Sequence, residues 1–192
     1  MLKKNILLYG SKSTAYIIYE MLKEMRGSPK FMFDPFNSKP LFRSKLLFSN
    51  KVKDFRNFIE KSKYFIVCIA REDGLARYKI SKELEKLNLK PINIKSKLSH
   101  INKNSKIGLG LVAMAKSYVN RGVKIGDYCI INTAAVVDHE CEIGNGVHLM
   151  GGCYLAGRVK IGDFTSVGAT ATILPDIKVG NRFAVVTHDF LP

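Results

Sequence analysis

The 192-residue sequence lacks any long apolar run. None of its uninterrupted apolar stretches approaches the roughly 18 residues that a transmembrane helix needs. The basic N-terminus is followed by the apolar run Ile6–Tyr9, which ends at Gly10 and is too short for the hydrophobic part of a signal peptide. We therefore expect a cytoplasmic protein that does not insert into a membrane.

Cysteine is also scarce, and no two cysteines form a CxxC pair. The four residues, Cys68, Cys129, Cys141 and Cys153, lie in apolar surroundings, which favours buried thiols over disulfides or a zinc site. A composition of 46% hydrophobic and 24% charged residues is typical of a globular protein with a buried core.

Acidic residues are few in the first part of the chain. Residues 1–106 contain 24 Lys and Arg against 9 Asp and Glu, whereas residues 107–192 contain 7 of each, so the net charge of +15 lies entirely in the first part. These lysines are scattered, without the aromatic interleaving or recognition motif of nucleic-acid binders. Two explanations of the positive charge remain open. It forms a solvated lysine-rich surface, or it creates a positive potential that attracts a phosphorylated or nucleotide-linked small substrate.

An aliphatic residue recurs every six positions from Ile101 onward. No helix and no alternating strand produces this period over such a length, whereas hexapeptide β-helix repeats do. The fifteen positions are Ile101, Ile107, Ala113, Val119, Ile125, Ile131, Val137, Ile143, Leu149, Leu155, Ile161, Val167, Ile173, Val179 and Val185.

A second period of 18 residues is superimposed on the first. An aliphatic-Gly pair recurs from Ile107-Gly108 to Val179-Gly180, which predicts that three hexapeptides make one triangular coil. Small or β-branched residues four positions after each aliphatic one, such as Cys129, Cys141 and Cys153, should also point into the prism. Each coil then stacks only on its neighbours.

Residues 1–95 predict a separate α/β domain. Strands are expected at Asn5–Gly10, Phe31–Asp34, Tyr64–Ala70 and Pro91–Ile94, with helices at Thr14–Met25 and Leu75–Leu87. This order favours an open, Rossmann-like parallel sheet, in which ligands bind beyond the carboxyl ends of the strands. Those ends are Gly10–Thr14, Asp34–Pro35 and Ala70–Asp73. The GSKST loop is neither a dinucleotide fingerprint nor a P-loop, so a tight turn and a substrate loop both remain open.

His139 and Glu140 carry the candidate chemistry of the repeat region. The register fixes Val137 and Cys141 inward, so His139 and Glu140 fall at an exposed corner between two faces. Imidazole is the side chain best matched to proton transfer near neutral pH, and an adjacent carboxylate can orient it and stabilise its protonated form.

These features resemble the hexapeptide-repeat acyltransferases. Among them, the chain is similar to sugar acetyltransferases related to sialic acid O-acetyltransferase and to the enzymes that acetylate UDP-linked 4-amino sugars in bacillosamine synthesis. The resemblance covers nearly the whole chain, from the strand that ends in Tyr9-Gly10 to its most specific stretch, residues 132–180. It implies a left-handed β-helix over residues 96–192, acetyl-CoA as co-substrate without a metal, and a homotrimer with its active site between subunits.

The resemblance also implies roles for individual residues. His139 would be the catalytic base and Glu140 its helper, and His148, pointing outward from a flat face, would contact acetyl-CoA. The bare backbone at Gly157 and beside Ala169 would suit the pantetheine arm, although tight turns explain these small residues as well. The acceptor, a nucleotide sugar, would bind at the first domain through Gly10, Lys12, Ser13, Thr14, Asp34 and Pro35.

Two departures from the family bear on these roles. The family's first loop runs glycine-x-x-glycine-histidine, whereas Ser13 and Thr14 stand at the corresponding positions, so the acceptor site is altered. The repeat stops at Pro192, less than one coil after Val179, so we expect a missing final coil and fewer cofactor contacts. His100 and His188 receive no role.

The sequence leaves several functions open. The leading one is an N-acetyltransferase that acts on a UDP-linked amino sugar for a surface glycan. An O-acetyltransferase for sialic-acid-like sugars and a non-catalytic binding protein are alternatives. A γ-type carbonic anhydrase requires three metal-ligating histidines, and His139, His148 and His188 lack suitable spacing.

Overall fold

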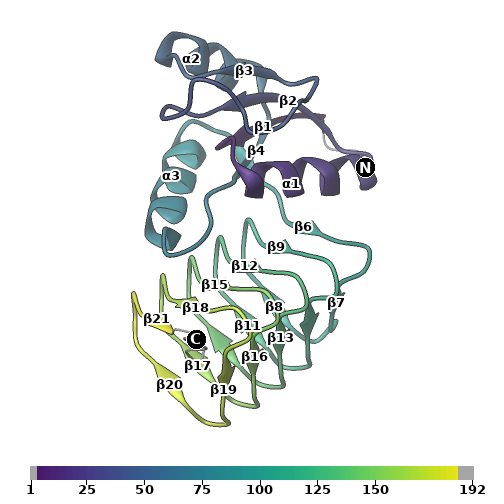
Figure 1. Cartoon of the computed structure of the whole chain (residues 1–192), viewed down its shortest axis with the longest axis vertical. Helices are drawn as coiled ribbons and strands as arrows, with labels where there is room; N and C mark the ends of the chain where they lie inside the picture. The colour runs from purple at the N-terminus through teal and green to yellow at the C-terminus, as the bar shows by residue number, and fades with distance from the viewer. Residues whose placement is uncertain (1–3, 186–192) are drawn as a thin grey trace, which may run out of the picture. The chain divides into compact units, whose positions relative to one another are not determined.

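A computed structural model describes residues 4–185, which divide into two compact units (Figure 1). The first unit consists of residues 4–69 and 79–94, and the second of residues 70–78 and 95–185. The segment 70–78, which precedes the repeat region in the sequence, therefore groups with the repeat region. His188 lies outside the described residues.

The first unit contains a five-stranded parallel sheet in the order β3-β2-β1-β4-β5. The central strand β1 is apolar in its middle, where Ile6, Leu7 and Leu8 are fully buried, as expected for a parallel strand. The strands are β1 (Lys4–Tyr9), β2 (Ser28–Phe33), β3 (Leu47–Ser49), β4 (Tyr64–Val67) and β5 (Lys90–Pro91). Helices α1 (Ser13–Glu24), α2 (Val52–Lys61) and α3 (Gly74–Lys86) lie between them in the chain. The predicted parallel sheet is confirmed.

The second unit is a prism of three parallel sheets, which we name by one strand each. The β15 sheet contains β6 (Ile94–Lys95), β9 (Val112–Ala113), β12 (Ile130–Ile131), β15 (His148–Leu149), β18 (Ser166–Val167) and β21 (Ala184–Val185). The β13 sheet contains β7 (His100–Ile101), β10 (Tyr118–Val119), β13 (Val136–Val137), β16 (Tyr154–Leu155) and β19 (Thr172–Ile173). The β14 sheet contains β8 (Lys106–Ile107), β11 (Lys124–Ile125), β14 (Glu142–Ile143), β17 (Lys160–Ile161) and β20 (Lys178–Val179).

The strand register confirms the 18-residue coil. Val119 pairs with Val137, and Ile125 with Ile143, so that each residue stacks on the one 18 positions later. From β7 onward, the second residue of each strand points into the prism, where Val137, Leu149 and Leu155 are fully buried. The cysteines are buried free thiols, as predicted.

A ladder of Asp and Asn side chains explains the recurring aliphatic-Gly pairs. At the corner after the β14 sheet, Asn145 Oδ1 accepts the Asp127 N–H at 2.9 Å, and Asp163 Oδ1 accepts the Asn145 N–H at 2.6 Å. Each side chain thus caps the backbone of the preceding coil. A Cβ at Gly126 would lie 2.8 Å from both the amide nitrogen and Oδ1 of Asn145, so the glycine is required by the close approach of the ladder.

The region between the two units corrects one expected strand. The predicted strand Pro91–Ile94 is two strands that pair in different sheets: β5 joins the sheet of the first unit, and β6 joins the β15 sheet. Asn93 lies between them.

The described helices are all too short or too polar to cross a membrane.

Candidate active site

His139 lies at the corner between β13 and β14, where the register predicts it. Val137 and Cys141, on either side, are fully buried, whereas the side chains of His139 and Glu140 are 37% and 58% exposed. Glu140 adopts a left-handed backbone with φ of 60°, and the residues 18 and 36 positions later, Arg158 and Asp176, do the same. This shared backbone turns the chain at the corner of each coil.

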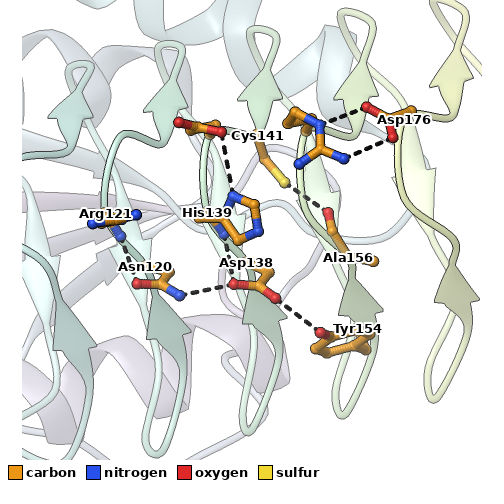
Figure 2. A network of polar contacts seen from close by, with 10 residues as sticks. Asn120, Arg121, Asp138, His139, Cys141, Tyr154, Ala156 and Asp176 are labelled. Carbon is orange, nitrogen blue, oxygen red and sulfur yellow. Dashed lines mark hydrogen bonds and ion pairs between the residues drawn. The ribbon is translucent and has the colours of Figure 1, made fainter.

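Asp138 fixes the backbone of this corner (Figure 2). Its Oδ1 accepts the N–H of His139 and the side-chain amide of Asn120, both at 2.7 Å, and its Oδ2 accepts the Tyr154 hydroxyl at 3.0 Å. The hydrogen bond from the His139 backbone, followed by those from Asn120 and Tyr154, lowers the pKa of Asp138. In turn, the hydrogen bond to Asp138 raises the pKa of Tyr154. Asp138 is therefore a carboxylate beside the histidine at neutral pH.

Asp138, Asn120 and Tyr154 were not among the predicted site residues. A usable signal was present, because Asn120 and Asp138 are 18 residues apart and must stack on adjacent coils. Side chains of this kind satisfy backbone groups at turns.

The imidazole of His139 contacts the carboxylate of Glu140. Nδ1 lies 3.3 Å from Glu140 Oε2 (Figure 2). When Nδ1 carries the proton and donates it to this carboxylate, Nε2 is left with a free lone pair. The pair can therefore present a proton acceptor to a molecule at the corner.

Gly157 lies directly beneath this ring, one coil further along the prism. A Cβ at Gly157 would come 2.6 Å from His139 Nε2 and 2.7 Å from its Cε1. The backbone of the two coils is joined by the Arg158 N–H, which donates to the His139 carbonyl at 2.9 Å.

The backbone N–H of Gly157 has no acceptor among residues 4–185. On the two preceding coils, the equivalent N–H groups of Arg121 and His139 donate to the side chains of Asn120 and Asp138, at 2.7 Å in each case. Ala156 occupies the same position before Gly157 and carries no oxygen. At this coil the side-chain acceptor is therefore absent, and the residue that carries the unpaired N–H is the one packed against the imidazole.

An ion pair follows on the same corner. Arg158 donates to both oxygens of Asp176, at 2.7 and 2.8 Å (Figure 2). The hydrogen bond from Arg158 lowers the pKa of Asp176. Both side chains are exposed, which limits the contribution of the pair to stability.

His148 points outward from β15, as expected, but it is only 3% exposed. The segment 70–78 lies over it: the Arg71 N–H donates to His148 Nδ1 at 2.9 Å, and Ser166 Oγ donates to the Arg71 carbonyl at 2.9 Å. Burial, and then the charge of Arg77, lowers the pKa of His148 to about 4. The ring is therefore neutral near pH 7, and because Nδ1 accepts a hydrogen bond, Nε2 carries the proton.

The remaining predicted cofactor residue, Ala169, lies elsewhere on the prism. It is exposed at the corner between the β15 and β13 sheets. No hydrogen bond joins His139 to His148 or Ala169 in the described part of the chain. Of the predicted cofactor residues, only Gly157 lies against the histidine. Nor do His, Cys, Asp and Glu side chains gather within residues 4–185 into a group that could hold a metal ion.

The predicted acceptor residues come together at the carboxyl ends of β1 and β2. Asp34 is buried, and its Oδ2 accepts the N–H and hydroxyl of Ser11, at 3.0 and 2.7 Å, and the Asn37 amide at 2.8 Å, while Oδ1 accepts the Phe36 N–H at 3.0 Å. Although burial raises the pKa of Asp34, these hydrogen bonds outweigh it and hold the pKa below its ordinary value. Asp34 therefore ties two loops together, and Ser11, which the sequence analysis missed, is its main partner.

The other members of this set differ in exposure. Gly10 has φ of 108°, and a Cβ there would lie 3.3 Å from the Cys68 carbonyl oxygen, so the turn requires glycine. Lys12, Ser13 and Pro35 are exposed, and Thr14 is half-buried. The groups that remain open to a ligand are thus those of the loop itself and not the Asp34 carboxylate.

Comparison with known proteins identifies the class of repeat. Residues 140–175 match the family model of the bacterial transferase hexapeptide, six repeats. No curated protein sequence gives a significant match.

Solved structures share the fold of both units. The acetyltransferase domain of PglB from Neisseria gonorrhoeae, in complex with acetyl coenzyme A, gives a TM-score of 0.86 at 21% identity and covers 100% of this chain and 92% of its own. PerB from Caulobacter crescentus, in complex with CoA and GDP-perosamine, gives 0.74 at 22% identity and covers 91% and 90%. WeeI from Acinetobacter baumannii gives 0.65 at 18% identity and covers 91% and 93%.

Proposed function

We propose that this protein is an acetyltransferase that uses acetyl-CoA to acetylate the amine of a UDP-linked amino sugar in surface glycan synthesis. The observation that carries the proposal is the corner at His139, where the imidazole contacts Glu140 through Nδ1 and packs with its Nε2 edge against Gly157, whose N–H has no acceptor among residues 4–185. The proteins of similar fold whose complexes contain acetyl coenzyme A, or CoA and GDP-perosamine, support the same reaction class.

The proposed chemistry is a direct transfer. Acetyl-CoA is the second substrate and supplies the acetyl group as a thioester. His139 Nε2 accepts a proton from the sugar amine as its nitrogen bonds to the acetyl carbonyl carbon, and it returns a proton to the sulfur as the carbon–sulfur bond breaks. The products are the N-acetyl sugar and free CoA thiol. The charge that develops on the ring is stabilised by the carboxylates of Glu140 and Asp138.

The free N–H of Gly157 supplies the complementary interaction. A backbone donor beside the base can stabilise the negative charge that develops on the acetyl oxygen during attack. A donor that is already oriented by the fold does not have to reorganise during the reaction. This assigns Gly157 to the acetyl end of the cofactor.

His148 and Ala169 are proposed to bind other parts of acetyl-CoA. The neutral ring of His148 is proposed to face the cofactor with its Nε2 edge, which lies 3.4 Å from Asn132 Nδ2, because its Nδ1 already accepts the Arg71 N–H. Ala169 presents an exposed corner with little side-chain bulk. The neighbouring subunit of a homotrimer is proposed to complete this groove.

The acceptor nucleotide is proposed to bind at the first unit. Gly10, Lys12, Ser13, Thr14 and Pro35 form the binding loops, and Asp34 holds these loops in place. The excess of basic residues in the first 106 positions favours a diphosphate-linked substrate. We further propose that the two functional domains, a Rossmann-like domain over residues 1–95 and a left-handed β-helix over 96–192, act together in the cytoplasm.

The first experiment measures CoA thiol release with acetyl-CoA and a panel of UDP-linked amino sugars. We expect turnover with an amino sugar, and a loss of about 10²- to 10⁴-fold in kcat for His139→Ala. His100→Ala is the matched control, because His100 is an exposed histidine that stacks on Tyr118 at 4.9 Å.

The same panel includes hydroxyl sugars related to sialic acid. Faster turnover with these would replace N-acetylation by O-acetylation. If no sugar is acetylated and calorimetry detects no binding of acetyl-CoA, the protein is a non-catalytic binder and the proposal is wrong.

A further inference from the structure

The ring of His139 is held from two sides. Glu140 Oε2 lies 3.3 Å from Nδ1, and the backbone of Gly157 lies against the opposite edge of the ring, at Nε2 and Cε1. At none of Gly122, Gly151, Gly152 and Gly180 in the second unit is an imidazole atom among the nearest neighbours of an added Cβ. The position of Nε2 therefore depends on Gly157 having no side chain.

Glycine is not needed at this position for its backbone conformation. Gly122 and Gly152, on neighbouring corners, have φ of 73° and 70°, where a side chain is strained, but Gly157 is not among the residues with positive φ. An alanine at position 157 thus meets a conflict of space alone, and that conflict is with a side chain.

We propose that Gly157 is a positioning residue for His139, and that its missing side chain sets the place of Nε2 in the active site. Only the expected effect on kcat rests on the proposed function. The placement of the ring is a structural claim that can be tested without turnover.

The expected response to a side chain follows from the distances. A Cβ 2.6 Å from Nε2 is well inside contact distance, so one of the two groups must move. The imidazole is the end of a flexible side chain that is 37% exposed, so it can swing away at little cost to the fold. Movement of the ring separates Nδ1 from Glu140 and moves Nε2 away from the Gly157 N–H.

The experiment compares Gly157→Ala with Gly180→Ala in the full-length protein. Gly180 is the matched control, since its φ is also not positive and a Cβ there would lie 3.3 Å from the exposed ring of Phe183. The imidazole 15N and 1H resonances are recorded for each variant. The chain has four histidines, and His139→Asn assigns the relevant signal.

We expect Gly157→Ala to shift the His139 resonances and to leave those of His100 and His148 in place. Its melting temperature should match that of Gly180→Ala. With acetyl-CoA and an accepted sugar, kcat should fall about 10²-fold while KM changes little. A displaced base accepts the proton less well in the transition state but does not change substrate binding. Gly180→Ala should retain wild-type kcat.

Unshifted His139 resonances in Gly157→Ala would overturn the proposal. Shifted resonances with an undiminished kcat would also overturn it, because Nε2 would then not need this position. If the wild-type protein acetylates no sugar, the proposed function fails, and the resonances alone decide whether Gly157 places the ring.

Discussion

Ala156 differs from the residues at the equivalent position on the two preceding coils, Asn120 and Asp138, because it has no side-chain oxygen. Asn120 and Asp138 each accept the backbone N–H of the residue that follows, at 2.7 Å. Ala156 has no side-chain oxygen and cannot accept the N–H of Gly157. On its coil, the Tyr154 hydroxyl donates to Asp138 Oδ2 at 3.0 Å. The free Gly157 N–H is thus a consequence of one missing oxygen.

Ala156→Asn should restore the missing rung. The new side-chain oxygen should accept the Gly157 N–H, as Asn120 does for Arg121, and remove this donor from the active site. We expect kcat to fall about 10²-fold, the effect typical of losing one oxyanion donor, without a lower melting temperature. Hydrogen exchange of the Gly157 amide should slow at the same time.

Ala156→Leu is the control for this prediction. Leucine has nearly the shape of asparagine without its oxygen, and Leu174 already occupies the equivalent position on the next coil. If Ala156→Leu loses as much kcat as Ala156→Asn, bulk and not the hydrogen bond is responsible.

At this scale, the sequence predicted the corner but not its partners. The six-residue hydrophobic repeat predicts that Val137 and Cys141 point inward, and both are buried. This register in turn places His139 and Glu140 at the turn. The roles of Asp138, Tyr154 and Gly157 arise from contacts between coils. They appear only when residues 16 or 18 positions apart are placed against one another.

Among the elements, the start of α3 is anchored to the prism by a buried arginine. Arg77 is 2% exposed, and it donates to the carbonyls of Tyr128, Gly146 and Val147 at 2.8, 2.7 and 3.3 Å. Burial lowers the pKa of Arg77 to about 10, so the guanidinium remains charged at neutral pH. These carbonyls lie on consecutive coils, which the arginine joins from outside.

Arg77→Met should therefore destabilise the protein. Methionine fills a similar volume but leaves these buried carbonyls without their charged donor, at a cost of about 3 kcal/mol. Urea unfolding measures the effect. Lys86→Met, at an exposed ion pair of the same helix, should change little, and equal stability of the two variants would contradict the anchoring role.

Prediction of elements succeeded where the chain is strongly periodic. The prism follows from a six-residue repeat, whereas β3 and α2 were missed because a three-residue strand and a polar helix with only Phe58 buried leave little pattern. The predicted strand 91–94 was wrong as a unit because a short, mostly apolar stretch does not reveal that its ends pair in different sheets.

The stability of the whole molecule should depend on pH through His148. Its pKa of about 4 in the folded state lies below the ordinary value of about 6.5 expected in the unfolded chain. Between these values the unfolded state binds more protons, so the free energy of unfolding falls as pH decreases from about 6.5 to about 4. The full effect is about 3 kcal/mol, and it is absent above this range.

His148→Asn removes the titration and retains an oxygen close to the position of Nδ1, where it can accept the Arg71 N–H. Urea unfolding from pH 7.5 to pH 4.5 should show a smaller loss of stability for this variant than for the wild-type protein. His100→Asn serves as the exposed control. Identical pH dependence of all three proteins would rule out His148 as the source.

The 18-residue stacking of the prism has a consequence for how such a protein can change over evolutionary time. Because each coil meets only its two neighbours, the prism has approximate translational symmetry along its axis. An in-frame duplication of one coil away from the corner would lengthen the protein and leave the surroundings of His139 intact. Length and chemistry are therefore separable properties, since the residues that repeat build the scaffold and those that break the repeat create the site.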